Sequence, residues 1–83
     1  MKRQDLLACA KEIAQDIERR PYDYWASKEY PIVLEKAYQG ESVQIEIQVL
    51  ELEDTYIHLG ISADTGKGLS AYFPPGTSVV IKK

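Results

Sequence analysis

The fold is decided between residues 32 and 64, where the chain reads IVLEKAYQGESVQIEIQVLELEDTYIHLGISAD. Apolar and polar residues alternate through most of this stretch, as they do in antiparallel strands with one buried and one solvated face. Turn-forming residues interrupt the alternation at Gly40-Glu41 and again at Glu53-Asp54-Thr55. We therefore expect strands at about 32–39, 42–52 and 56–64.

The first turn sets how the first two strands pair. A glycine followed by any other residue suits a two-residue type II′ turn, so Gly40-Glu41 would pair Gln39 with Ser42. In that register Glu35 faces Glu46 on the side of the sheet opposite the core. Two carboxylates placed in this way repel each other unless a cation or a basic partner relieves the repulsion. This predicted pair favours a binding role over plain solvation for that side of the sheet, and the open side is the strongest indication of function in the sequence.

The second and third strands indicate where the sheet bends and which side is buried. Every second residue from Val43 to Val49 is apolar, and the apolar phase then slips to Leu50 and Leu52. Such a slip is typical of a β-bulge near Val49-Leu50. In the third strand the alternation sends one set of residues to the core, namely Ile57, Leu59, Ile61 and Ala63. It exposes the set between them, namely Tyr56, His58, Gly60, Ser62 and Asp64.

The chain after residue 64 supplies one or two further strands. We expect a hairpin loop over residues 64–68 and a strand at about 69–73, in which Phe73 faces Leu59 and Ala71 faces Ile61. Tyr72 would then cover the bare backbone of Gly60 on the other side. Residues 74–77 have the composition of a type II turn, and a short last strand is expected at about 78–82.

The chain before residue 32 predicts one helix, followed by an ordered segment that connects the helix to the sheet. Apolar residues recur at helical spacing, at Leu6, Ala10, Ile13 and Ile17. They indicate an amphipathic helix at about 3–19, which Pro21 ends. Residues 21–31, PYDYWASKEYP, are too aromatic for a flexible linker. The predicted fold class is α+β, with one N-terminal amphipathic helix packed on one face of a four- to five-stranded antiparallel meander sheet.

Composition indicates a single domain over residues 1–83. The net charge is −3, and residues 41–64 hold six acidic residues but neither Lys nor Arg. Nucleic acid is a disfavoured partner, because phosphate binding needs clustered cations. The apolar runs are far shorter than the roughly 20 residues of a membrane-spanning helix, so we expect no membrane segment. Cys9 is the one cysteine and no secretory leader is evident, which predicts a cytoplasmic protein without disulfides.

The sequence offers little catalytic chemistry. The one His and the one Cys lie on different predicted elements, which argues against a zinc site, and we expect neither metal nor cofactor. His58 is the one candidate base, but Ser62 lies four residues along the same strand, about 13 Å away, too far to act as its nucleophile. Residues 60–68 share glycines with phosphate-binding loops, yet the glycine spacing is one residue too long and a strand pattern follows. We therefore expect no catalytic residues and no enzyme.

The side of the sheet that a single helix leaves open is the candidate site. A solvated face is the plainer interpretation, since antiparallel sheets tolerate water on one side. The carboxylates favour instead a small acidic protein-binding module, such as an adaptor, inhibitor or immunity-type protein, that holds a partner with a basic surface. The candidate partner-binding residues are Glu35, Glu46, Gln48, His58, Asp64 and Tyr72. The secondary candidates are Tyr22, Tyr24 and Trp25, since Tyr and Trp dominate binding hot spots.

Two alternatives stay open. The first is a structural subunit that forms homo-oligomers, such as a homodimer, whose self-interface would supplement the thin core of so short a chain. The second is a small enzyme or ligand-binding protein centred on His58, which requires a concave pocket around that residue.

Overall fold

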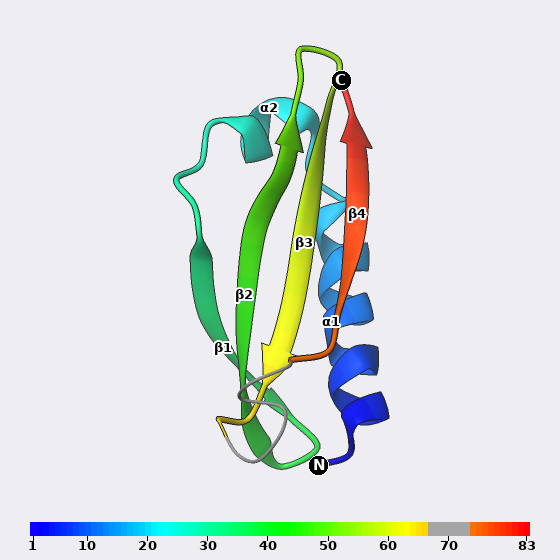
Figure 1. Cartoon of the computed structure of the whole chain (residues 1–83), viewed down its shortest axis with the longest axis vertical. Helices are drawn as coiled ribbons and strands as arrows, with labels where there is room; N and C mark the ends of the chain where they lie inside the picture. The colour runs from blue at the N-terminus through cyan, green and yellow to red at the C-terminus, as the bar shows by residue number, and fades with distance from the viewer. Residues whose placement is uncertain (67–73) are drawn as a thin grey trace.

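The computed structural model describes residues 1–66 and 74–83, and in them an N-terminal helix packs against a four-stranded antiparallel sheet (Figure 1). The elements are α1 (Arg3–Ile17), α2 (Tyr22–Ala26), β1 (Ile32–Tyr38), β2 (Glu41–Leu52), β3 (Tyr56–Asp64) and β4 (Gly76–Lys82). The strand order is β1-β2-β3-β4, so every strand pairs with its neighbour in sequence. The predicted α+β meander under one helix is confirmed.

Helix α1 forms because its apolar residues share one face. Its buried residues are Leu6, Cys9, Ala10, Ile13, Ala14 and Ile17. At its start the Asp5 carboxylate accepts the Lys2 backbone N–H at 3.1 Å, which also places a negative charge at the positive end of the helix dipole. At its end the Ile17 carbonyl accepts the indole N–H of Trp25 at 2.9 Å. The helix thus ends two residues before the predicted boundary.

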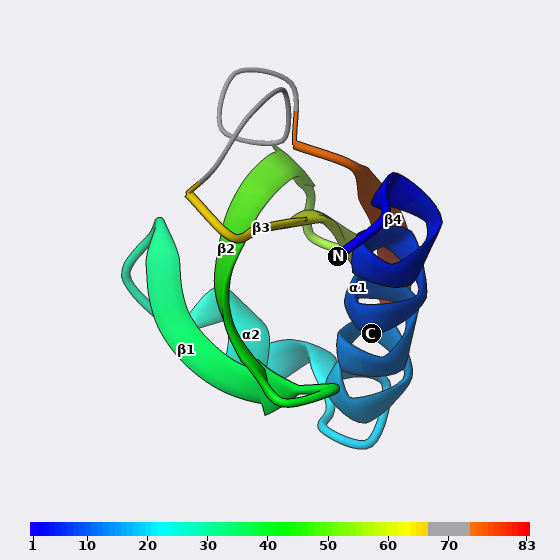
Figure 2. The same ribbon diagram turned by 90° about the horizontal axis from the view of Figure 1, so that it is seen from below.

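The core lies between α1 and the inner face of the sheet. The strands contribute Val43, Ile45 and Ile47 from β2, Ile57, Leu59, Ile61 and Ala63 from β3, and Val79 and Ile81 from β4. Seen along the long axis, the sheet forms an arc with α1 across its open side (Figure 2). Helix α1 packs chiefly on β3 and β4. The inner residues of β1 are therefore only half-buried.

The β1–β2 hairpin differs from the predicted register. Its turn is Gln39-Gly40, with φ of 52° and 77°, and Tyr38 pairs with Glu41. Two successive left-handed residues are the mark of a type I′ turn, whose twist matches that of the flanking strands better than other turns. Each residue of β1 therefore meets a partner two positions earlier than expected. The predicted pairing of Glu35 with Glu46 is wrong.

The side chains of β1 still lie on their predicted faces, because the β1–β2 register is shifted by an even number of residues. Glu35 lies opposite Gln44, and Glu46 lies opposite Val33. On its other side Gln44 pairs with Asp64 of β3. An uncharged amide thus stands between two carboxylates that would otherwise be neighbours.

The predicted bulge in β2 is confirmed. The register of β2 on β3 shifts between Val49 and Glu51, which leaves Leu50 as the extra residue. Leu50 and Leu52 are 56% and 51% exposed, so the apolar phase slip marks the bulge without adding to the core. Leu50 turns to the outer side of the sheet.

Strand β4 occupies the place that the sequence suggested for residues 69–73. Ile61 pairs with Thr77 and Leu59 pairs with Val79. The other edge of β3 is taken by β2, so the predicted pairings of Leu59 with Phe73 and of Ile61 with Ala71 are wrong. The strand predicted at 69–73 and the predicted position of Tyr72 lie outside the described residues.

Gly76 is the first residue of β4, whereas the sequence predicted it within a turn. It can pair this closely with β3 because it has no side chain. A Cβ atom on Gly76 would lie 2.6 Å from the carbonyl oxygen of Ile61. The Ala63 N–H also donates to the Pro75 carbonyl at 3.0 Å, which extends the pairing beyond the strand. Gly76 thus permits a close approach of two backbones at this end of the sheet.

Candidate functional site

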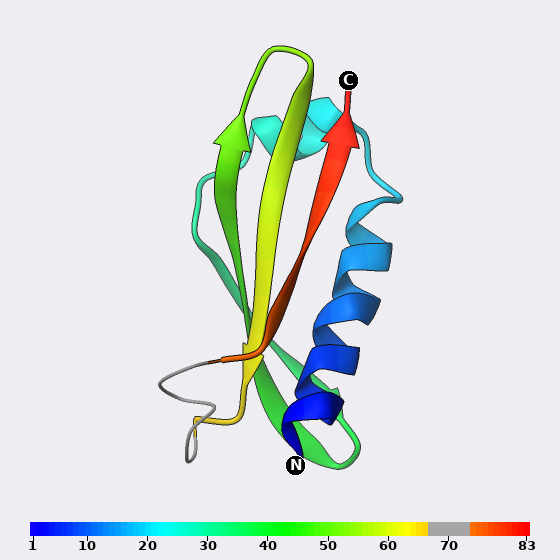
Figure 3. The same cartoon turned by 45° about the vertical axis from the view of Figure 1, so that its right-hand side comes forward.

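The outer face of the sheet is the side turned away from α1, which lies along the inner side only (Figure 3). It carries the side chains of Val33, Glu35, Ala37, Ser42, Gln44, Glu46, Gln48, Leu50, Glu51, Tyr56, His58, Ser62, Asp64, Ser78, Val80 and, at one end, Lys82, together with the bare Gly60. The structure thus brings five of the six primary candidates, Glu35, Glu46, Gln48, His58 and Asp64, to one surface. The sixth, Tyr72, is not among the described residues.

The charge of the outer face has one sign over its centre. Glu35, Glu46, Glu51 and Asp64 come from β1, β2 and β3. Within residues 1–66 and 74–83, the ion pairs join Glu41 to the terminal amine, Asp16 to Arg19 and Glu12 to Lys36, and none of them involves an outer-face carboxylate. The negative field of this surface is therefore not neutralised by these neighbours.

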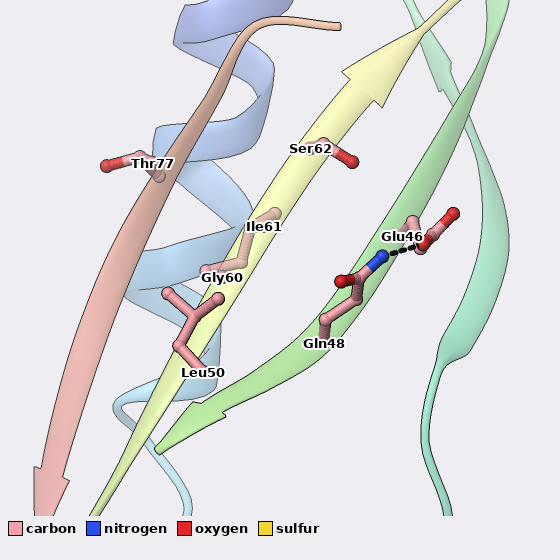
Figure 4. A pocket seen from close by; sticks show the side chains of 7 residues that line it. All are labelled: Glu46, Gln48, Leu50, Gly60, Ile61, Ser62 and Thr77. Atoms are coloured by element: carbon pink, nitrogen blue, oxygen red, sulfur yellow. Dashed lines mark hydrogen bonds between the residues drawn. The ribbon is translucent and has the colours of Figure 1, made fainter.

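A shallow hollow of about 300 Å³ lies on the outer face where β2 bends (Figure 4). It is lined by Glu46, Gln48, Leu50, Gly60 and Ser62, and Ile61 and Thr77 complete it. Gly60 contributes no side chain, and the bulge turns Leu50 outward beside it. Glu46 and Gln48 were predicted as site residues from the sequence, whereas Leu50, Gly60 and Ser62 were not. The phase slip at Leu50 was the one signal that could have located the hollow.

The polar side of the hollow is ordered by one hydrogen bond. The amide of Gln48 donates to Oε1 of Glu46, two residues away on the same face of β2 (Figure 4). This contact holds the carboxylate along the strand beside the hollow. It leaves Oε2 of Glu46 and the carbonyl oxygen of Gln48 available as acceptors.

His58 does not line this hollow. It pairs with Glu51 of β2 on one side and with Val80 of β4 on the other. The Glu51 carboxylate accepts a hydrogen bond from Tyr56, which raises the pKa of that phenol to about 12. Glu51 thus has a partner other than His58.

The aromatic segment, which holds the secondary candidates Tyr22, Tyr24 and Trp25, closes one end of the core. Trp25 is 9% exposed and caps α1 through its indole N–H. The Tyr22 hydroxyl donates to the Glu53 carbonyl at 2.6 Å, and so ties α2 to the turn between β2 and β3. These two side chains thus have structural contacts within the chain, and their role in partner binding stays a prediction.

Two cations lie close to the ring of Tyr24. The guanidinium of Arg20 lies 4.8 Å from its centroid and the ammonium of Lys28 lies 4.3 Å from it. The ring also meets Trp25 edge to face at 4.8 Å. Cations this close to an aromatic ring are attracted by its quadrupole. Two cations thus lie near this ring, whereas none of the ion pairs named above within the described residues brings a cation to an outer-face carboxylate.

A second hollow, of about 220 Å³, lies between α1 and β1. Its lining includes Ile13, Ile17, Trp25 and Leu34. Beside it Lys36 points inward from β1 and lies 4.0 Å from the Glu12 carboxylate. An inward-pointing lysine on an edge strand discourages pairing with another strand.

The remaining predictions about chemistry concern Cys9 and metals. Burial raises the pKa of the Cys9 thiol, which disfavours the reactive thiolate. In the part of the chain that the structure describes, no three His, Cys, Asp or Glu side chains converge as metal ligands would. Neither described helix has the length and apolar character required to cross a membrane.

No protein-family model, no curated protein sequence and no solved structure matches this chain.

Proposed function

We propose that this chain is a small protein-binding module that holds a basic partner on the outer face of its sheet, in the manner of an adaptor, inhibitor or immunity-type protein. The observation that carries the proposal is the set of carboxylates on that face, none of which is in an ion pair within the described residues. Three of them, Glu46, Glu51 and Asp64, lie in residues 41–64, which hold neither Lys nor Arg. A surface of one sign attracts partners of the opposite sign and speeds their association.

The spacing of the carboxylates supports a surface that is stable before it binds. Gln44 separates Glu35 from Asp64 across three strands, and Ser62 rather than an acid faces Glu46. Like charges in direct cross-strand contact would destabilise the sheet. Staggering them keeps the negative potential and removes the closest repulsions.

Apolar side chains on the same face supply contact area that a charged surface alone would lack. Val33, Leu50 and Val80 are 53%, 56% and 49% exposed, and they lie on three different strands. Interfaces typically combine an apolar centre with a polar rim, and most of the binding energy resides at the centre. We expect the partner to cover Leu50 and to place its cations on the surrounding acids.

A defined peptide tests the proposal. The probe is a fluorescein-labelled peptide in which arginine alternates with glycine and serine, and its anisotropy reports binding at low salt. The double variant Glu35→Lys/Glu46→Lys reverses the charge at two of the four outer-face carboxylates, Glu35, Glu46, Glu51 and Asp64. The matched control Glu18→Lys/Glu29→Lys makes the same change in net charge at exposed residues away from the sheet. We expect the affinity to fall at least about tenfold in the first variant and much less in the second, because local rather than net charge steers docking. Equal losses in the two variants contradict the proposal.

The two alternatives lack an observation that favours them. Self-association through the β1 edge has to overcome the inward-pointing Lys36. A site centred on His58 would need a concavity around that residue, and the hollow on the outer face lies beside Gly60 instead. The free, buried Cys9 accords with action in a reducing compartment such as the cytoplasm.

A further inference from the structure

We propose that the hollow beside Gly60 is a socket for one arginine side chain of the basic partner, with Glu46 as the group that receives the guanidinium. This inference rests on the proposed function and adds the chemical group that the outer face recognises. It follows from three features of the hollow: its bare floor, its apolar wall and its paired acceptors.

The floor of the hollow is Gly60, and its backbone conformation does not require a glycine. Gly60 lies in the middle of β3 and its φ lies outside the left-handed range, so the backbone itself would accept a side chain there. A glycine inside a strand weakens the strand and often marks a place where a ligand or another chain approaches closely. Here the side chain of Leu50 partly covers the place where a Cβ atom of Gly60 would lie, and the hollow opens beside it.

The wall suits an aliphatic stem. Leu50 stands beside Gly60, with its Cδ1 3.2 Å from where a Cβ of that residue would be. The long stems of Arg and Lys cover apolar surface while their charged heads stay near polar groups. A stem laid over Gly60 and against Leu50 therefore carries its head toward Glu46 and Gln48, which line the same hollow (Figure 4).

The acceptors favour a guanidinium over an ammonium. The Gln48 amide donates to Oε1 of Glu46, which leaves Oε2 of Glu46 and the carbonyl oxygen of Gln48 as two acceptors from neighbouring side chains. A guanidinium presents several donors in one plane and can engage two acceptors at once, whereas an ammonium acts as a point charge. Ser62 lies opposite Glu46 on β3 and adds a hydroxyl to the polar side.

The size and charge of the hollow argue against other occupants. Its volume of about 300 Å³ lies at the lower end of pockets that hold small ligands, which fits a side chain better than a cofactor. The Glu46 carboxylate repels anions. A purely apolar side chain would desolvate that carboxylate without pairing it, which costs free energy.

The test is an NMR titration of the nitrogen-15-labelled protein with N-acetyl-arginine amide. The comparison ligands are the lysine analogue and the citrulline analogue, which has nearly the shape of arginine but no charge. We expect saturable shifts of the amide signals of Leu50, Gly60 and Ser62 with arginine, several-fold weaker binding of lysine and no saturation with citrulline. Glu46→Gln should abolish the arginine response, whereas Glu18→Gln, which removes a charge at an exposed residue away from the sheet, should preserve it.

A second variant blocks the socket without changing any charge. Gly60→Val places a branched side chain on the floor, and it should abolish the arginine response while the arginine-rich peptide still binds to the acidic face with reduced affinity. If Gly60→Val does not give a folded spectrum, Gly60→Ala replaces it, because only the flexible end of Leu50 must move.

The outcomes separate the socket from the acidic face. Equal responses to arginine and lysine that survive Gly60→Val overturn the socket and leave the proposed function standing. A saturable arginine response that is lost in Gly60→Val, in a protein that does not bind the arginine-rich peptide, supports the socket and overturns the broader role of the face.

Discussion

Leu50 of β2 packs over the bare backbone of Gly60 on β3, so closely that a Cβ atom on Gly60 would lie 3.2 Å from Leu50 Cδ1. The β-bulge produces this contact, since it leaves Leu50 without a partner on β3 and turns it outward. The same contact makes the hollow in which Glu46 and Gln48 meet. One extra residue in a strand thus links the local shape of the sheet to the candidate site.

The two strand glycines should respond differently to alanine. Gly60→Ala should change the free energy of unfolding by less than about 1 kcal/mol, because removal of a strand glycine offsets the displacement of Leu50. Gly76→Ala should cost about 2 kcal/mol or more, since its Cβ would lie 2.6 Å from the backbone oxygen of Ile61. Urea unfolding of both variants measures the difference. Equal destabilisation would show that this account of the close contacts is wrong.

The indole of Trp25 should stabilise the fold through its N–H group as well as through its buried ring. Trp25→Phe keeps an aromatic ring but removes the donor to the Ile17 carbonyl, which still accepts the Arg20 N–H at 3.2 Å. It should lower the free energy of unfolding by about 1–3 kcal/mol, because a buried hydrogen bond and part of a buried ring are lost. Tyr22→Phe removes a hydrogen bond to Glu53 that lies at the surface and serves as the control, with an expected loss of about 1 kcal/mol or less. Thermal or urea unfolding ranks the two, and a larger loss for Tyr22→Phe would contradict the assignment.

Tyr56 should titrate later than an ordinary tyrosine. Its hydrogen bond to the Glu51 carboxylate raises its pKa from 10.0 to about 12. The folded protein therefore favours the neutral phenol, and this contribution to stability is complete below pH 10 and lost as the pH rises through about 12. The difference in alkaline ultraviolet titration between the wild type and Tyr56→Phe isolates this group. In Glu51→Gln its pKa should move back toward 10, and an unchanged titration would rule out the hydrogen bond as the cause.

Lys36 should keep the β1 edge from pairing with a second copy. Lys36→Val removes the inward-pointing charge next to the hollow between α1 and β1. We expect the wild type to stay monomeric and the variant to self-associate as its concentration rises, because an apolar edge strand is a template for pairing. Light scattering across a concentration series follows both proteins, with Lys11→Val on α1 as the control. A wild type that dimerises would favour the homo-oligomer alternative.

The faces of β2 and β3 could be predicted from sequence because burial imposes a strict period of two. Ile45, Ile47, Leu59 and Ile61 lie in the core as the alternation predicts, and Glu46, His58 and Asp64 lie outside it. The helix could be predicted for the same reason, at its own period. These inferences depend only on which residues are apolar.

The pairing register could not be predicted, because it depends on a turn that the residues leave open. Gly40 fits either a turn with Glu41 or a turn with Gln39, and the second requires a left-handed conformation at a residue that is not glycine. A left-handed residue costs little free energy in a turn whose twist matches that of the strands, but the local sequence does not indicate which residue adopts it. The predicted register placed Glu35 opposite Glu46, where two carboxylates would repel each other. In the structure Glu35 lies opposite Gln44 and this repulsion is avoided.

The pairing of the last strand with β3 could not be predicted, because the sequence holds two candidate segments for that edge. Residues 69–73 and 76–82 both alternate, and sequence reasoning assigned the edge to the first. Gly76 lets the second segment approach Ile61 closely, and Val79 and Ile81 then fill the core below α1. The outward turn of Leu50 was missed for a related reason, since an apolar residue beyond the bulge looks like a core residue until its partner is known.

The salt dependence of peptide binding tests the central claim most directly, namely that carboxylates on the outer face hold a basic partner. The affinity of the arginine-rich peptide, measured over a series of salt concentrations, should fall steeply for the wild type and for Glu18→Lys/Glu29→Lys, because mobile ions screen exposed charges. It should be weak at every salt concentration for Glu35→Lys/Glu46→Lys. An affinity that ignores salt, or that the outer-face variant retains, would contradict the account.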